Sequence, residues 1–170
     1  MGHRSLETER LILRQFTAAD AQGMLDILTQ EPTLRYFPPG GALSREKVAR
    51  MIERLNQHWD EHGFGLWAVT LKKDGRLIGR CGLQRLPETD EVEVDFILNP
   101  DDWGHGYATE AGRAAVKYGF SQLGLDEIVG IVHPDNAASR RALEKLGMVD
   151  GGLTEYFGMA VHRYAVSRPG

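Results

Sequence analysis

Hydrophobic and polar residues follow short regular patterns along most of the chain, and these patterns predict its secondary structure. Residues 6–16 (LETERLILRQF) and 65–72 (GLWAVTLK) alternate or run apolar as β-strands do. Between them, apolar residues recur twice at helical spacing. The first recurrence follows Thr17 and Asp20, which resemble a capping box. The second opens at Ser44 and predicts one amphipathic face, made of Val48, Met51, Ile52, Leu55 and Trp59.

The middle of the chain predicts three consecutive strands. Asp74 and Gly75 form a turn signal between two apolar runs within residues 66–83, which indicates a hairpin. A third strand alternates strictly from Glu91 to Phe96 and stops before Asn99-Pro100. Strands joined by such short turns predict an antiparallel meander.

The second half of the chain predicts helices and strands in alternation. A helix is expected from about Tyr107 to Leu123, followed by a strand at 127–132, a short helix from Asn136, and two final strands within 151–168. The strand–helix–strand step implies one parallel pair inside a mostly antiparallel sheet. The predicted fold class is therefore α+β, a mixed sheet with helices packed on its faces.

Composition narrows the class of protein. The 170 residues fit a single domain over 1–170, with 42% hydrophobic and 26% charged residues. A net charge of −4 without any Lys/Arg block argues against a nucleic-acid partner. No apolar run is long enough to cross a membrane. The single cysteine, Cys81, is interpreted as a core residue, and a chain with one cysteine fits a reducing compartment. A cytoplasmic protein is expected.

No metal site is predicted. His58 and His62 lie four residues apart on a predicted helix, but no third ligand stands at a matching spacing.

Two glycines at the start of a predicted helix carry the first chemical signal. Gly104 and Gly106 precede Tyr107, at a place where helix propensity disfavours glycine. The first amides of a helix are unpaired and attract anions, which approach the backbone closely only where no Cβ stands in the way. Ala108 is small, and Thr109 adds a hydroxyl. A phosphate cradle and an ordinary turn both remain open on this pattern alone.

Three segments together resemble a known family. Residues 6–20 (LETERLILRQFTAAD), 93–111 (EVDFILNPDDWGHGYATEA) and 132–148 (VHPDNAASRRALEKLGM) are similar to the GNAT superfamily of acetyl-CoA-dependent N-acetyltransferases. The likeness extends from Leu6 to about Val166 and is strongest to the ribosomal-protein N-terminal acetyltransferases. It implies the GNAT fold, with helices on both faces of the sheet. It also implies direct acetyl transfer from acetyl-CoA to a primary amine through a ternary complex, with no metal.

The resemblance also assigns residues to coenzyme A. The family's turn carries R/Q-x-x-G-x-G/A, and here Trp103 departs from the Arg/Gln position. The amides implied to hold the pyrophosphate belong to Gly104, His105, Gly106, Tyr107, Ala108 and Thr109. The backbone implied to pair with the pantetheine arm belongs to Phe96, Ile97 and Leu98. Asn136 is implied to contact the pantetheine and is equally suited to cap a helix. Ser139 faces the cofactor or lies on the surface.

Acetylation requires a neutral amine nitrogen, so a base must remove the proton of the ammonium. Glu91, Glu93 and Asp95 alternate on one face of a predicted strand, which is either functional or a solvated face. Glu93 matches the family's glutamate and is the expected general base, acting through water. Leu143 stands where many members carry a tyrosine as general acid. Ser139 is the candidate replacement, with Tyr107 or direct proton transfer as alternatives.

The acceptor is less defined. Asp95, Phe37 and Trp67 are the candidate acceptor contacts, although the two aromatic residues also fit a core or a lid. Possible acceptors are a protein or peptide N-terminus, a polyamine-like or aminoglycoside-like amine, and an amino-acid analogue. In the family the final strands often form dimer contacts, so a homodimer is possible. The competing hypothesis is a non-catalytic acyl-CoA-binding sensor or interaction module of the same fold.

Overall fold

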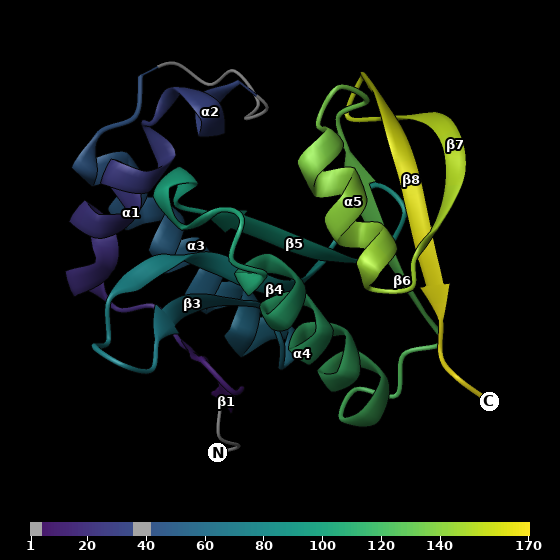
Figure 1. The fold of residues 1–170 in the computed structure, drawn as a ribbon, viewed down its shortest axis with the longest axis horizontal. Coiled ribbons are helices and arrows are strands. Elements are labelled where there is room, and N and C mark those ends of the chain that lie inside the picture. Colours follow the sequence, from purple (N-terminus) through teal and green to yellow (C-terminus); the bar gives the residue numbers. More distant parts are fainter. Residues whose placement is uncertain (1–4, 36–41) are drawn as a thin grey trace.

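The computed structural model describes residues 5–35 and 42–170, and Phe37 lies outside them. Eight strands form one sheet in the order β1-β2-β3-β4-β5-β6-β8-β7 (Figure 1). The strands are β1 (Leu6–Glu7), β2 (Leu11–Arg14), β3 (Leu66–Leu71), β4 (Leu77–Arg85), β5 (Val92–Leu98), β6 (Glu127–Val132), β7 (Val149–Tyr156) and β8 (Met159–Ser167). The helices are α1 (Ala21–Leu28), α2 (Glu31–Leu34), α3 (Arg45–His62), α4 (Tyr107–Ser121) and α5 (Ala137–Lys145), with 3₁₀ turns η1 (Ala18–Asp20) and η2 (Pro100–Asp102).

The sheet opens in its middle, between β5 and β6. These two strands are parallel and are registered at Glu93↔Val129, whereas every other described pair of neighbours is antiparallel. In Figure 1, β3, β4 and β5 run across the molecule, while β6, β7 and β8 stand upright at its right side. The predicted meander of β3, β4 and β5 and the predicted parallel pair are both confirmed. That the whole chain forms a single domain stays a prediction.

A local signal placed the start of α3 correctly, and another placed the start of α1 to within one 3₁₀ turn. Ser44 Oγ accepts a hydrogen bond from Lys47 N (3.2 Å) at the start of α3. The Asp20 carboxylate accepts one from Thr17 N (2.8 Å), but this capping box opens the 3₁₀ turn η1 rather than α1 itself. The predicted first strand is instead a hairpin of β1 and β2, because Thr8 N donates to Leu11 O (2.9 Å) and turns the chain. The sequence patterns did not indicate α2 or η2.

The two faces of the sheet are covered by different helices. Val94, Phe96 and Leu98 of β5 pack in the cluster that contains the buried face of α4. Ile97 packs in the cluster of α1 and α3. Because successive strand residues point to opposite faces, Glu93 and Asp95 face the side of α1 and α3.

Trp67 corrects one expectation. It was expected to contact the acceptor, but its side chain is 1% exposed. Its ring lies 5.2 Å from the rings of Trp59 and Tyr118, between centroids, so it is a core residue. Cys81 is buried as predicted. Within residues 5–35 and 42–170, no helix combines the length and hydrophobicity that crossing a membrane requires.

Candidate active site

A cleft of about 710 Å³ lies at the opening between β5 and β6. Its walls come from β5, the turn before α4, α5, α2 and the start of β8. The cleft brings together twelve of the residues that the sequence indicated, namely Glu93, Asp95, Phe96, Ile97, Leu98, Gly104, Gly106, Tyr107, Ala108, Thr109, Asn136 and Ser139. Of the described candidates, His105 and Trp67 do not line it.

The turn before α4 has the geometry of an anion cradle. Gly104 and Gly106 have φ of +82° and +80°, a left-handed conformation that glycine adopts without strain. A Cβ added at Gly104 would meet nothing within 4 Å, so this side of the turn is open. In the described part of the chain, no backbone carbonyl accepts a hydrogen bond from the amides of residues 104–109. Unpaired amides at a helix N-terminus fit a pyrophosphate group.

Arg10, from the hairpin of β1 and β2, braces this turn from outside the cleft. Its Nη1 donates to His105 O (2.9 Å), and its Nε donates to Glu110 Oε1 (2.7 Å). The guanidinium carbon lies 4.5 Å from the centroid of the Tyr107 ring, a cation–π distance. Arg10 thus contacts His105, Tyr107 and Glu110 along the path of the turn into α4. His105 contacts Arg10 only through its backbone carbonyl, and its side chain is exposed.

Glu110, in the first turn of α4, completes the brace. Its Oε2 accepts hydrogen bonds from Thr8 Oγ1 (2.6 Å) and Arg10 N (2.8 Å). Burial opposes the charged form, but the hydrogen bonds from Thr8 and Arg10 prevail and lower the pKa of Glu110. A carboxylate in the first turn of α4 also interacts favourably with the helix dipole.

Glu93 is a buried carboxyl group at the floor of the cleft. Its side chain is 8% exposed, and Gln84 Nε2 donates to its Oε1 (2.5 Å). Burial first, and then the negative charge of Asp95, raise the pKa of Glu93 to about 8. A carboxyl group with such a pKa exchanges a proton near neutral pH, as a general base must.

The other two acids of the predicted face have cationic partners. Asp95 pairs with Arg80, with Nε to Oδ1 at 3.1 Å and Nη2 to Oδ2 at 3.4 Å. Glu91 lies just before β5, where it accepts hydrogen bonds from Tyr156 OH (2.5 Å) and Arg163. The interpretation of these acids as a solvated face is therefore wrong. Of the three, Glu93 forms no ion pair with a described residue, and the charge of Arg80 acts on it only at longer range than on Asp95.

Helix α5 supplies the opposite wall. Asn136 Oδ1 accepts a hydrogen bond from Ser139 N (3.2 Å), so Asn136 caps α5 and also lines the cleft. Leu143, at the position of the family's tyrosine, is 2% exposed and packs in the core. Its side chain carries no proton to donate, whereas the hydroxyl-bearing Ser139 and Tyr107 both line the cleft.

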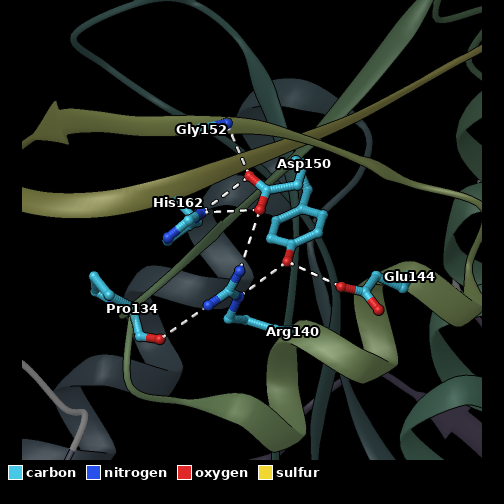
Figure 2. Close-up of polar contacts among 7 residues, drawn as sticks. Pro134, Arg140, Glu144, Asp150, Gly152 and His162 are labelled. Carbon is cyan, nitrogen blue, oxygen red and sulfur yellow. Dashed lines mark hydrogen bonds and ion pairs between the residues drawn. The ribbon is translucent and has the colours of Figure 1, made fainter.

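A polar network fixes α5 against the hairpin of β7 and β8 (Figure 2). Arg140 Nη2 pairs with Asp150 Oδ2 (3.2 Å), and Arg140 Nε donates to Tyr164 OH (3.1 Å). His162 Nδ1 lies 3.0 Å from both oxygens of Asp150. Hydrogen bonds to Asp150, the one from His162 first, lower its pKa. The network holds the two walls of the cleft in a defined arrangement.

Comparison with known proteins agrees with this geometry. Residues 10–149 match the family model described as "Acetyltransferase (GNAT) domain". The chain belongs to the GNAT acetyltransferase family. It is 33% identical over 153 residues to the uncharacterised N-acetyltransferase YoaA of Bacillus subtilis, covering 89% of this chain and 86% of that protein. This GNAT chain is thus an acyltransferase enzyme of a family that uses acetyl-CoA.

Two solved structures show the same fold. An acetyltransferase from Agrobacterium tumefaciens superimposes with a TM-score of 0.84 and 26% identity, covering 98% of this chain and 95% of that one. The ribosomal-protein-S5-alanine acetyltransferase of Vibrio fischeri superimposes with a TM-score of 0.80 and 16% identity, covering 96% of each chain. The likeness to the ribosomal branch is shown at the level of the fold.

Several residues that line the cleft were not predicted from the sequence. They are Arg80 and Gln84 on β4, Thr33 on α2, and Phe157 and Met159 at the turn between β7 and β8. The register of β4 and β5 places Gln84 opposite Glu93, a pairing that a hairpin alignment of the two strands would have indicated. No sequence signal marked Thr33, because α2 is only four residues long.

Proposed function

We propose that this GNAT enzyme transfers an acetyl group from acetyl-CoA to a primary amine in a ternary complex, with Glu93 as the general base. One observation carries the proposal. A buried carboxyl group with a raised pKa shares a single cleft with an open, unpaired anion cradle at a helix N-terminus. The cradle suits the cofactor, and the carboxyl group suits proton removal from an ammonium.

The cofactor residues are proposed from their positions in the cleft. The amides of residues 104–109 hold the pyrophosphate, although the His105 side chain takes no part. The backbone of Phe96, Ile97 and Leu98 pairs with the pantetheine arm. Asn136 and Ser139 contact that arm from α5. When bound, acetyl-CoA supplies the activated acyl group.

The proton steps are proposed for two side chains. Glu93 accepts the proton of the acceptor ammonium, directly or through a water molecule, so that the nitrogen can attack. The new C–N bond replaces the C–S bond, and Ser139 is the proposed relay that passes the second proton lost by the nitrogen to the departing sulfur. Because position 143 is a leucine, the family's usual tyrosine takes no part in this step.

A thiol-release assay tests the proposal. The wild-type enzyme with acetyl-CoA is expected to release CoA only when an amine is present, and Glu93→Gln is expected to abolish most of this release while it still binds CoA. The leucine at position 143 favours a second candidate, a CoA-binding module without turnover. Tight CoA binding without release for any amine would support that module and contradict the enzyme proposal.

A further inference from the structure

A side chain on the neighbouring strand holds the candidate base. The register of β4 and β5 places Gln84 directly opposite Glu93, so both side chains stand on the same face of the sheet. Gln84 Nε2 donates to Glu93 Oε1 at 2.5 Å, and both residues line the cleft. The Glu93 carboxyl group makes no other hydrogen bond to a described residue. Gln84 therefore fixes one of its two oxygens.

The other oxygen of Glu93 stays accessible. Oε2 has no hydrogen-bond partner, yet among the described residues Thr33 Oγ1 is the one fully buried side-chain polar atom that lacks a partner. Oε2 therefore keeps exposed surface, although Glu93 as a whole is only 8% exposed. Because Glu93 lines the cleft, this oxygen is the one available for a proton from a bound acceptor.

The partner of Glu93 is neutral, which leaves the carboxyl group able to change its charge. Burial raises the pKa of Glu93 most, and the charge of Asp95 raises it further. The hydrogen bond from Gln84 and the charge of Arg80 act in the opposite direction. A cationic partner in place of Gln84 would stabilise the carboxylate and weaken it as a base.

The other neighbours of Glu93 add no charge to this balance. Val129 of β6, which is registered with Glu93, is apolar. His58 of α3 is neutral at pH 7, because burial lowers its pKa below 6.5. The charged residues of α5 that line the cleft are Arg141 and Lys145, and neither contributes to the pKa of Glu93. The position of the carboxyl group is therefore set by its hydrogen bond across the two strands.

We propose that Gln84 is a positioning residue for the general base, whose amide holds Oε1 of Glu93 so that Oε2 faces the cleft and takes the proton of the acceptor ammonium. This inference rests on the proposed function. An O–H bond forms at Oε2 as one N–H bond of the ammonium breaks, and the electron pair that stays on nitrogen attacks the acyl carbon. Glu93 then releases this proton to water and returns to the carboxylate.

Loss of the amide has two consequences. A carboxylate without its hydrogen bond is less stable, so the pKa of Glu93 rises further. The carboxyl group is also free to rotate, so Oε2 meets the ammonium in the productive orientation less often. A lysine at this position would act on the pKa in the opposite direction.

Kinetics of Gln84→Met test the role, because methionine is of similar length and lacks the amide. With alaninamide and spermidine as acceptors, kcat is expected to fall about tenfold at pH 7. The midpoint of the pH profile of kcat/KM is expected to move to higher pH, with the KM for acetyl-CoA unchanged. Gln84→Lys should move the midpoint to lower pH by about one unit. Each variant is compared with the wild type on the same amine, so the titration of the amine itself cancels.

Gln57→Met is the matched control. Gln57 Nε2 donates to Glu61 Oε1 (2.8 Å) on the exposed surface of α3, so this variant removes the same kind of pair away from the cleft. It should keep the wild-type kcat and midpoint.

An unchanged midpoint in Gln84→Met would overturn the inference, because a merely structural role lowers kcat without moving the midpoint. If Gln84→Met does not fold, the midpoint of Gln84→Lys decides in the same way. Absence of CoA release from the wild type with both amines would instead contradict the proposed function, and this inference with it.

Discussion

At the scale of single residues, two neighbouring carboxyl groups on one strand differ because of their partners. Asp95 lies beside Arg80, which supplies two hydrogen bonds to its carboxylate. Glu93 accepts a hydrogen bond from the neutral side-chain amide of Gln84, and burial favours the protonated form of Glu93. This difference separates a structural acid from a candidate base two positions away.

Replacing Glu93 by glutamine tests the base. We expect Glu93→Gln to lower kcat by about 100-fold or more, because positioned general bases contribute about 10²–10⁴. The wild-type kcat/KM should rise with pH toward a plateau above about 8, and the variant should lose that rise. Steady-state kinetics from pH 6 to 9 measure both. The exposed Glu155→Gln serves as the control and should keep the wild-type profile.

The open turn can be tested with one side chain. Gly104→Asn should weaken CoA binding at least about tenfold, or about 1.4 kcal/mol, because a Cβ at Gly104 meets no protein atom within 4 Å and the side chain extends into the open side of the turn. Asparagine tolerates positive φ better than other residues with a Cβ. Gly75→Asn, at φ +75° in the β3–β4 turn, is the matched control for backbone strain. If calorimetry finds the same CoA affinity for both variants, the cradle assignment is wrong.

At the scale of elements, the hairpin of β1 and β2 supports the cofactor turn. Thr8 and Arg10 reach Glu110, about 100 residues away in sequence, and Arg10 also holds the His105 carbonyl. The hairpin therefore contributes to the site without lining the cleft. Arg10 of this hairpin holds the backbone amides of the turn in position and does not itself contact the ligand.

Substituting Arg10 tests this support. Arg10→Ala should weaken CoA binding several-fold, about 1 kcal/mol, with kcat at saturating acetyl-CoA nearly unchanged. Lys72→Ala is the control, because it removes an ion pair with Glu7 of the same hairpin that does not touch the turn. Titration calorimetry and a kcat and KM determination measure the two effects. Equal losses in both variants would mean that the hairpin acts only through general stability.

At the scale of the whole molecule, His58 connects α3 to the sheet in a neutral state. Its Nδ1 lies 2.8 Å from Phe64 O, and its Nε2 accepts a hydrogen bond from Arg85 N (3.1 Å). Burial lowers the pKa of His58 below 6.5. As the pH falls, the unfolded chain therefore protonates His58 at a higher pH than the folded chain does. The folded state loses stability as the pH falls below about 6.5.

Denaturant titrations at pH 7 and pH 5 measure this contribution. We expect the free energy of unfolding to be lower at pH 5 than at pH 7, because the unfolded chain takes up a proton at His58 that the folded chain resists. His58→Gln should show a smaller fall, whereas His105→Gln, with its exposed ring, should behave as the wild type. An unchanged pH dependence in His58→Gln would contradict the role of the neutral ring.

Glu93 acts in the opposite direction. Its pKa is raised from 4.5 to about 8, so the folded state retains the proton longer and loses stability as the pH rises through this range. Glu93→Gln stays neutral and should raise the melting temperature by several degrees at pH 8, with little change near pH 4.5. Differential scanning fluorimetry at the two pH values measures the difference. A lower melting temperature at pH 8 would contradict the burial of the charge.

Local signals were sufficient for much of the fold. The Asp74-Gly75 turn, the cap at Ser44 and the alternation before Asn99 each act within a few residues, so sequence inspection identified these elements. Trp67 was misassigned because alternation shows that a strand has two faces but not what covers each face. Thr33 was missed because a four-residue helix has no periodicity to detect.

By itself, the sequence determined the order of elements, the glycine turn before α4 and the shared face of Glu93 and Asp95. These features depend on backbone preferences and on the two-residue period of a strand. Only the tertiary structure decided which charges are neutralised and which hydroxyl is left unpaired. Arg80, Gln84 and Thr33 reach the cleft from separate elements, and burial and pairing arise only when those elements pack together.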